Sequence, residues 1–305
     1  MIRSCRLFRL ALLVWSLIFC CAPRGDAQLG MFTKDQRMEF TRDWKGDRFP
    51  DGRPKVSDAV LTRLKNVTAE EAWAVLRGAG YNNQFEAGWK VINPGERLVG
   101  RVVTAVFMPL RPDVNAVINE YGKKEGRVGG GQNSWVIDTL QRNDVLVVDL
   151  FGKIKDGTFA GDNLGTSIFA KSGTGLIVDG SVRDVSGISE IKGLRCFVRG
   201  FDPSALADVT LMGMNVPIRI GRVTVMPGDV VVSDPEGLTF IPAQLAETVA
   251  DYSEITQLQD TWGHEMLREG KYTPGQVDSR WTKEMIEEFN RYAEQQGAKA
   301  RMKTE

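Results

Sequence analysis

Cysteine and histidine are both scarce in this chain. Only four cysteines occur in 305 residues, and three of them fall within the first 21, which leaves Cys196 alone in the rest. An intrachain disulfide is therefore excluded once those first residues are removed. The single histidine, His264, precedes a glutamate, but Arg268 stands where a zinc protease motif needs its second histidine. A zinc site normally needs several His or Cys ligands, so we interpret His264 as a surface or structural residue.

The sequence also lacks an excess of charge of either sign. Its 39 basic residues balance 39 acidic ones. Removing the four arginines and one aspartate of the first 27 residues leaves 35 basic and 38 acidic residues, a net charge of −3. This balance does not favour an anionic partner such as nucleic acid or a charged membrane surface, so we expect neither.

The first 27 residues have the pattern of a secretory signal peptide. Three arginines precede an apolar run at residues 10–21, and a short polar stretch ends at Ala27. The run is shorter than the roughly 20 residues of a spanning helix, and Phe19 is too bulky for a lipoprotein site before Cys20 or Cys21. We therefore predict cleavage after Ala27 and export of the mature chain to the periplasm or medium, without a membrane anchor.

Hydrophobic patterning divides the remainder into three parts. Residues 28–98 form a polar arm and then two short helices, at 56–64 and 68–77, the second opened by a Thr68–Glu71 capping box. Residues 99–243 contain short β-branched runs separated by Gly, Pro and Asp, which is typical of buried strands. Residues 244–305 have helical spacing and predict a helical C-terminal extension.

Within residues 99–243 the predicted strands alternate with helices, which indicates an α/β layered core. Predicted strands lie at 101–108, 144–150, 175–178, 196–198, 217–220 and 229–232, and predicted helices at 134–142 and 164–171. Two turns containing Pro and Gly predict a hairpin over residues 223–241.

Residues 161–184 carry most of the functional signal. Gly161 begins a strand-to-helix turn, where free N–H groups at residues 162–164 suit a carboxylate or phosphate. The strand that follows ends at Arg183 and Asp184. A guanidinium binds a carboxylate through two parallel hydrogen bonds, and a carboxylate binds a hard divalent cation. Taken singly, Asp162 fits a helix N-cap and Arg183 a surface ion pair. Together they predict a site for a small keto acid and a metal.

Six segments of the chain, between about residues 100 and 242, resemble one family. It contains the regulator of ribonuclease E activity A and the class II 4-hydroxy-4-methyl-2-oxoglutarate aldolases. The matching segments are 99–104, 144–149, 161–164, 179–184, 225–229 and 237–242. Within that family, members that keep the aspartate after the arginine resemble metal-dependent aldolases, whereas the ribonuclease regulators lack it. This chain keeps it, as Asp184.

The resemblance implies a fold and a set of roles. The fold would be a layered β/β/α sandwich of the swivelling, phosphohistidine-domain-like type. Asp184 would hold Mg²⁺ or Mn²⁺, largely through waters. Arg183 and the backbone of Gly161, Asn163 and Leu164 would hold the pyruvate unit, and Asp162 would orient a water for proton transfer. The substrate would be a small 2-keto acid, such as 4-hydroxy-4-methyl-2-oxoglutarate or oxaloacetate.

The resemblance also implies a homotrimer or homohexamer in which the neighbour's C-terminal helix completes the metal site. Asp260, Glu265 and Glu269 are all open candidates for that role. Two other functions compete with the lyase. One is a non-catalytic oligomeric binding or scaffold protein on the same fold. The other is a demethylmenaquinone methyltransferase-like protein, which the absence of a Gly-rich loop near residues 147–152 disfavours.

Overall fold

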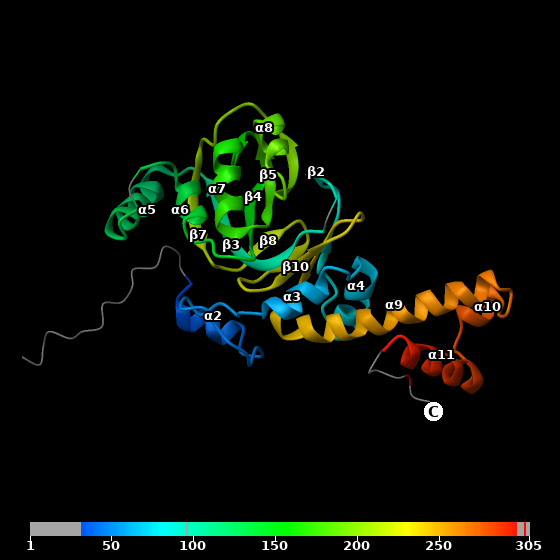
Figure 1. Ribbon diagram of the computed structural model, residues 1–305. Helices are drawn as coiled ribbons and strands as arrows, with labels where there is room; N and C mark the ends of the chain where they lie inside the picture. The colour runs from blue at the N-terminus through cyan, green and yellow to red at the C-terminus, as the bar shows by residue number, and fades with distance from the viewer. Residues whose placement is uncertain (1–31, 96, 128, 298–301, 303–305) are drawn as a thin grey trace, which may run out of the picture.

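A rounded body and a projecting helical tail make up the molecule (Figure 1). The structure, a computed structural model, describes residues 32–95, 97–127, 129–297 and 302. The predicted signal peptide at residues 1–27 lies outside this range. Of the helices in the described part, none combines the length and the apolar character needed to span a bilayer.

A nine-stranded mixed sheet forms the centre of the body. Along its main path the order is β1-β11-β10-β3-β4-β5-β6-β2, and β7 pairs with the far half of β3. The strands are β1 (Phe85–Glu86), β2 (Lys90–Ile92), β3 (Val99–Pro109), β4 (Asp144–Thr158), β5 (Gly175–Val182), β6 (Arg195–Phe201), β7 (Val209–Met214), β10 (Val230–Ser233) and β11 (Leu238–Ile241). The four strands β3 to β6 are parallel to one another, and the remaining pairings are antiparallel.

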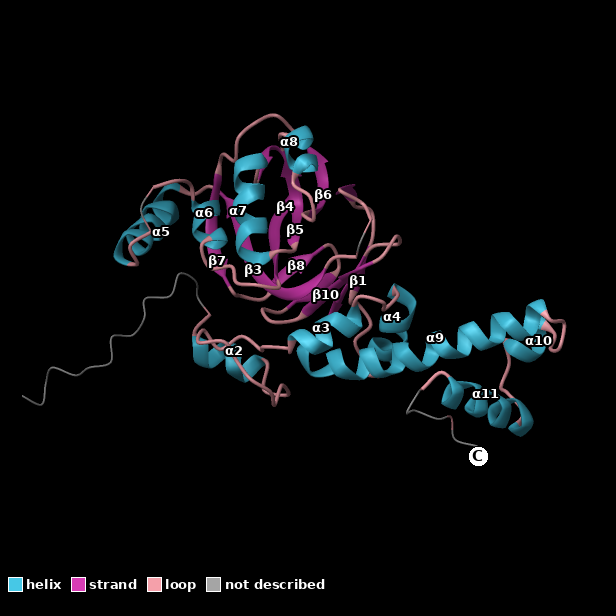
Figure 2. Ribbon diagram, viewed as in Figure 1, coloured by secondary structure: helices cyan, strands magenta, loops and turns pink. Residues whose placement is uncertain are grey.

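Alternate residues of the central strands face two different layers. Leu146 and Val148 of β4 pack with the helices, whereas Val145 and Val147 pack with a two-stranded sheet. The helices of this layer are α5 (Pro112–Lys124), α6 (Gln132–Ile137), α7 (Asp162–Ser172) and α8 (Val185–Glu190), and the small sheet pairs β8 (Ile218–Ile220) with β9 (Val223–Val225). Figure 2 shows α7 lying alongside β4 and β5 on this face of the sheet. The α/β class is therefore confirmed, while the swivelling type stays a prediction.

A second set of helices covers the end of the sheet formed by β10 and β11. These are α3 (Asp58–Leu64), α4 (Ala69–Gly78) and the first half of α9 (Ala246–Arg268), which follows a 3₁₀ turn (Ala243–Leu245). The predicted capping box is present, because the Glu71 N–H donates to Thr68 Oγ1 at 3.2 Å and Glu71 Oε2 accepts from the Thr68 N–H at 2.8 Å. Two predicted helices of the N-terminal part are thus confirmed.

The polar arm contains a helix that the sequence pattern did not indicate, α2 (Lys34–Phe40). The side chain of Arg37 on this helix is fully buried, and its Nε donates to the Asn215 carbonyl at 2.8 Å. Arg53 lies against the body in the same way, with its guanidinium 3.4 Å from the buried Asp144 carboxylate. The buried residue of α2 is Arg37 rather than an apolar stripe, which is why periodicity missed this helix.

Three predicted elements differ from the structure. The hairpin expected over residues 223–241 is confined to β10 and β11, because β9 pairs with β8 instead. The helix expected at residues 134–142 runs instead from Gln132 to Ile137. Strand β4 continues eight residues beyond the predicted end through left-handed backbone at Phe151 and Gly152. Its polar extension has no hydrophobic alternation for the sequence to reveal.

The C-terminal tail has a hydrophobic cluster of its own. The second half of α9 packs with α10 (Pro274–Val277) and α11 (Lys283–Gln295) around the buried Trp262. The ring centroid of Trp262 lies 4.7 Å from that of Trp281 and 6.0 Å from that of Phe289. Figure 1 shows this part projecting from the body. The predicted helical extension is therefore present and folds largely on itself.

A buried carboxyl group stabilises the turn that enters β10. Asp229 is 5% exposed, and its Oδ2 accepts from the Met226 N–H at 2.8 Å. Burial raises the pKa of Asp229 to about 8, although backbone hydrogen bonds oppose this. The folded protein therefore keeps a proton that the unfolded chain releases near pH 4.

We predict that the free energy of unfolding decreases between pH 5 and pH 8, because the pKa of Asp229 is higher in the folded state than in the unfolded chain. Each such group contributes at most about 1.4 kcal/mol per pH unit. Burial also raises the pKa values of Asp144 and Asp149, which act in the same direction. Urea unfolding of Asp229→Asn should show a shallower pH dependence than wild type. An equal slope in both proteins would contradict this assignment.

Candidate active site

The six residues singled out by the sequence lie together in one pocket. The pocket has a volume of about 240 Å³ and lies where β4 and β5 end and α7 begins. Its lining includes Gly161, Asp162, Asn163, Leu164, Arg183 and Asp184. Residues about twenty positions apart in the sequence therefore share one small cavity, of a size that suits a keto acid.

Backbone pairing of two segments brings the residues together. The Phe159 N–H donates to the Ser181 carbonyl at 2.9 Å, and the Arg183 N–H donates to the Ala160 carbonyl at 3.1 Å. These bonds extend the parallel pairing of β4 and β5 beyond the regular ladder and place Gly161 beside Asp184. A methyl group on Gly161 would overlap the Asp184 carboxylate. Glycine at this position therefore makes room for the acidic side chain.

Asp184 has an unusual backbone conformation, with φ 52° and ψ 43°. Aspartate tolerates this left-handed region better than most residues, and such strain is typical of functional sites. Asp184 occupies the N-cap of α8, yet its side chain makes no capping hydrogen bond. The carboxylate is half exposed and has Oδ2 3.4 Å from Nε of Arg183, itself 42% exposed. A pair this open contributes about 0–1 kcal/mol, so both groups remain available to a ligand.

Asp162 is not the helix N-cap that an isolated aspartate at this turn would suggest. Gly161 is the N-cap of α7, and Asp162 is the first residue of the helix. Its Oδ1 accepts from the Asn163 N–H at 2.7 Å, so this amide is not free as the sequence suggested. In the described part of the chain, the N–H groups of Asp162 and Leu164 donate no hydrogen bond, as expected of a first helical turn. A carboxylate can therefore bind to two amides rather than three.

The donor atoms of this pocket suit a hard divalent cation. Among the described residues, the carboxylate of Asp184 forms an ion pair with Arg183 through Oδ2, which leaves Oδ1 open to coordinate. Magnesium commonly binds through one or two carboxylates and keeps several waters. Among the described residues, no cluster of three or more His, Cys, Asp or Glu side chains forms a complete metal shell. Waters, substrate or a second subunit would have to supply the other ligands.

The sequence did not indicate three features of the pocket wall. Asn133 of α6 donates from Nδ2 to the Phe159 carbonyl at 2.7 Å and so supports the loop that ends at Gly161. Ala205 and Leu206 also line the pocket. The only available signal was the Gly129–Gly131 loop before Asn133. Such a loop does not show which residues it brings to a distant site.

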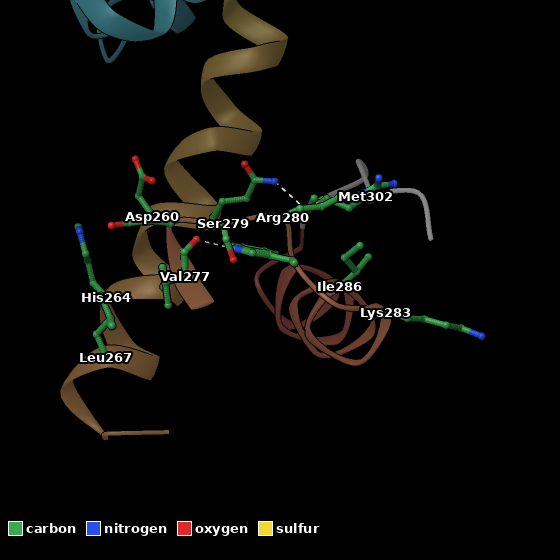
Figure 3. A pocket seen from close by; sticks show the side chains of 13 residues that line it. Asp260, His264, Leu267, Val277, Ser279, Arg280, Lys283, Ile286 and Met302 are labelled. Atoms are coloured by element: carbon green, nitrogen blue, oxygen red, sulfur yellow. Dashed lines mark hydrogen bonds between the residues drawn. The ribbon is translucent and has the colours of Figure 1, made fainter. Parts of the chain in front are cut away.

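Two larger hollows occur elsewhere in the described structure. One, of about 550 Å³, lies between the tail helices (Figure 3) and includes Asp260 and His264, one helical turn apart on α9. Partial burial raises the pKa of Asp260, and His264 opposes this. The second, of about 540 Å³, is basic and lies near Arg142. We place the chemistry in the smaller pocket because, of these three, it is the one that combines a guanidinium, a half-exposed carboxylate and open helix amides.

The candidate partners for the metal do not line the Asp184 pocket of their own chain. Asp260 and Glu265 belong to α9, and Glu269 caps its C-terminal end. All three residues lie at the surface, Asp260 partly covered by its neighbours. Any contribution they make to the site would therefore come from another subunit.

The fold and the pocket together define an α/β protein with a small polar site at the carboxyl ends of parallel strands. The model of the RraA-like family (Aldolase/RraA) matches residues 54–240, more than half of the chain. The chain therefore belongs to the RraA-like family.

Similar proteins include one named as an aldolase and one assigned to the RraA proteins. A Halalkalibacterium halodurans protein named as a candidate 4-hydroxy-4-methyl-2-oxoglutarate aldolase is 31% identical over 137 residues, 44% of this chain and 64% of its own length. That coverage is less than two thirds of the relative. The solved structure of Streptomyces coelicolor RraAS2, described as an unusual member of the RNase ES inhibitor RraA protein family, has 27% identity and a TM-score of 0.56. It covers 72% of this chain and 98% of its own.

A protein of Pseudomonas syringae pv. tomato has the same fold. Its solved structure superimposes with a TM-score of 0.60 at 22% sequence identity, over 76% of this chain and 98% of its own. At this identity the similarity concerns the fold alone.

We predict that Gly161→Ala displaces the Asp184 carboxylate and weakens binding of Mn²⁺ at least tenfold, with little loss of stability. The added methyl group meets the flexible end of an acidic side chain rather than backbone. Gly78→Ala is the matched control, because a methyl group there meets no atom within 4 Å. Titration calorimetry with Mn²⁺ and thermal unfolding would measure both effects. Wild-type Mn²⁺ affinity in Gly161→Ala would show that Asp184 is not the metal ligand.

Proposed function

We propose that this protein is a divalent-metal-dependent carbon–carbon lyase. Its substrate would be a small 2-keto acid cleaved or decarboxylated through a pyruvate enolate, such as 4-hydroxy-4-methyl-2-oxoglutarate or oxaloacetate. The observation that carries the proposal is the meeting of Arg183, Asp184 and the first turn of α7 in one pocket. Family membership supports it, as does the name of the Halalkalibacterium relative.

Substrate binding would use the cationic and amide donors of the pocket. The Arg183 guanidinium suits the planar carboxylate of a pyruvate unit, and it is open enough to accept one. The N–H groups of Asp162 and Leu164, with the positive end of the α7 dipole, favour the negative charge that develops on the enolate oxygen. Gly161 and Asn163 form the backbone of this turn and allow close approach.

Asp184 would hold Mg²⁺ or Mn²⁺ beside these donors. When bound, the cation would supply Lewis-acid polarisation of the keto group. The left-handed backbone of Asp184 directs its carboxylate to Gly161, and hence to the start of α7. The pocket is not lined by a lysine among the described residues, which disfavours a Schiff-base mechanism.

Asp162 would position a water for proton transfer. Its carboxylate is exposed at the pocket, and its Cβ packs close to Gly187 of α8, where an added methyl group would lie 2.8 Å away. The Asn163 N–H donates to one carboxylate oxygen and so fixes the side chain. The second oxygen therefore has a defined direction. A positioned carboxylate of this kind typically contributes about 10²–10⁴-fold as a general acid or base.

We predict distinct effects for three substitutions. Asp184→Ala should abolish metal-dependent turnover, since it removes the cation's protein ligand. Arg183→Lys should reduce kcat/KM roughly ten- to a hundredfold, because lysine keeps the charge but loses the two-pronged contact. Asp162→Asn should lower kcat with a smaller change in KM. Steady-state assays with oxaloacetate and Mg²⁺ or Mn²⁺ would measure these effects.

Lys123→Gln, an exposed change on α5, is the control and should behave as wild type. Two outcomes would defeat the enzyme proposal. One is wild-type protein that neither binds pyruvate nor turns over a 2-keto acid with metal present. The other is an Asp184→Ala variant with unchanged activity.

A second function is favoured by the Streptomyces structure. Its description assigns that protein to a family of RNase ES inhibitors, so a non-catalytic regulatory or scaffold role is available to the same fold. Asp184 distinguishes the two functions. A scaffold does not need a residue with a left-handed backbone that presents a half-exposed carboxylate at a pocket.

We further propose a homotrimer or homohexamer in which the tail completes the site. The chain's own pocket provides one carboxylate for the proposed metal, and the second half of α9 projects from the body with α10 and α11, where it is exposed to a neighbouring subunit. Light scattering should give a mass that is a multiple of three chains. One of Asp260→Asn, Glu265→Gln and Glu269→Gln should weaken Mn²⁺ binding without dissociating the oligomer. A fully active monomer would contradict this assembly.

A further inference from the structure

The basic pocket of about 540 Å³ lies at the opposite end of the sheet from the candidate active site. It is formed where β3, β4, β5 and β6 begin, whereas the Asp184 pocket is formed where β4 and β5 end. Helix α7 connects the two places, with Asp162 at one end and Gly173 just beyond the other. Its 11 residues separate them by about 16 Å. The two hollows therefore cannot be parts of one site.

Four cationic side chains line this pocket, namely Lys65, Arg97, Arg142 and Arg195. Acidic side chains are absent from its described lining. Lys65, Arg97 and Arg142 form no ion pair with any described residue. The nearby carboxylates of Asp58 and Asp144 are already paired, with Arg101 and Arg53 respectively. Three uncompensated positive charges thus converge on one concave surface.

The ends of two helices do not account for this charge. Helices α3 and α7 both terminate here, and each C-terminus carries roughly half a negative charge. Together they balance about one of the cations. The last carbonyl of α7, at Ser172, already accepts from the Asn143 N–H at 2.8 Å. The pocket therefore contains more positive charge than the two helix C-termini neutralise.

The pocket wall is held in place before any ligand arrives. Arg142 lies against Gly173, where a side chain would collide with its guanidinium. The Arg142 carbonyl accepts from Nη2 of Arg101 at 2.8 Å, and Arg97 donates from Nη1 to the Val67 carbonyl. Guanidinium groups match phosphate oxygens well, because each presents several N–H donors in one plane. A volume of this size accommodates a metabolite larger than the keto acid of the other pocket.

We infer that this pocket is a binding site for a small molecule that carries at least two phosphate groups. The described lining contains no aromatic side chain on which a nucleobase could stack. Sites for single-stranded nucleic acid combine basic grooves with such aromatic platforms, so recognition here depends on the anion itself. The inference is independent of the proposed lyase activity.

Calorimetric titration of the mature chain with inorganic pyrophosphate, at constant ionic strength and without divalent cations, tests the site. We expect saturable binding of one pyrophosphate per chain, with orthophosphate at least tenfold weaker. Arg142→Gln and Lys65→Gln should each weaken pyrophosphate binding about tenfold or more, since each removes a charge-assisted contact. Lys65 is exposed at the end of α3, so its substitution leaves the core unchanged even where Arg142→Gln proves unstable.

Two further variants determine where the anion binds. Lys123→Gln removes an equal charge from a distant helix and should bind pyrophosphate as wild type does. Arg183→Gln alters only the candidate active site and should also leave binding unchanged. The inference is wrong if wild type shows no saturable binding. It is equally wrong if Arg183→Gln is the variant that loses pyrophosphate, or if all four substitutions weaken binding alike.

Discussion

The parallel pairing of β4 with β5 is the constraint on which the site depends. Two parallel neighbours end at the same edge of a sheet, so the segments that follow them must run side by side. Here the hydrogen bonds of Phe159 and Arg183 continue that alignment past the regular strands. Gly161 and Asp184 consequently touch, although 22 residues separate them. A shift of register by one residue would turn Arg183 and Asp184 toward the opposite faces.

The two faces of the sheet are used for packing rather than for chemistry. Both are filled by apolar side chains, from the helices on one side and from β8 and β9 on the other. Polar function is left to the two ends of the strands, where backbone groups are free and loops can carry charged residues. The carboxyl ends hold the Arg183–Asp184 pair, and the amino ends hold the basic pocket. Helix α7 extends between these ends.

The sequence predicted the parts of the fold that depend on local patterning. Buried strands such as β4 and β5 contain continuous β-branched runs, and α4 has its capping box, so both could be recognised from neighbouring residues. Helix α2 could not, because it is attached by Arg37 to the distant Asn215 carbonyl rather than by an apolar stripe. The same limit applies to the site. Residues 161–184 were found through one contiguous motif, whereas Asn133 enters the pocket through tertiary packing alone.

The tail and the body of the molecule differ in stability. Its buried cluster consists of Trp262 and four other residues, against the much larger clusters of the body, and within the described chain α9 connects the two. A helix pair with so small a core opens at a lower free energy than the sheet does. Local unfolding would therefore begin at α10 and α11, and the first half of α9 would stay packed on α3 and α4. The tail can consequently detach, refold or exchange partners while the body, with its two pockets, remains folded.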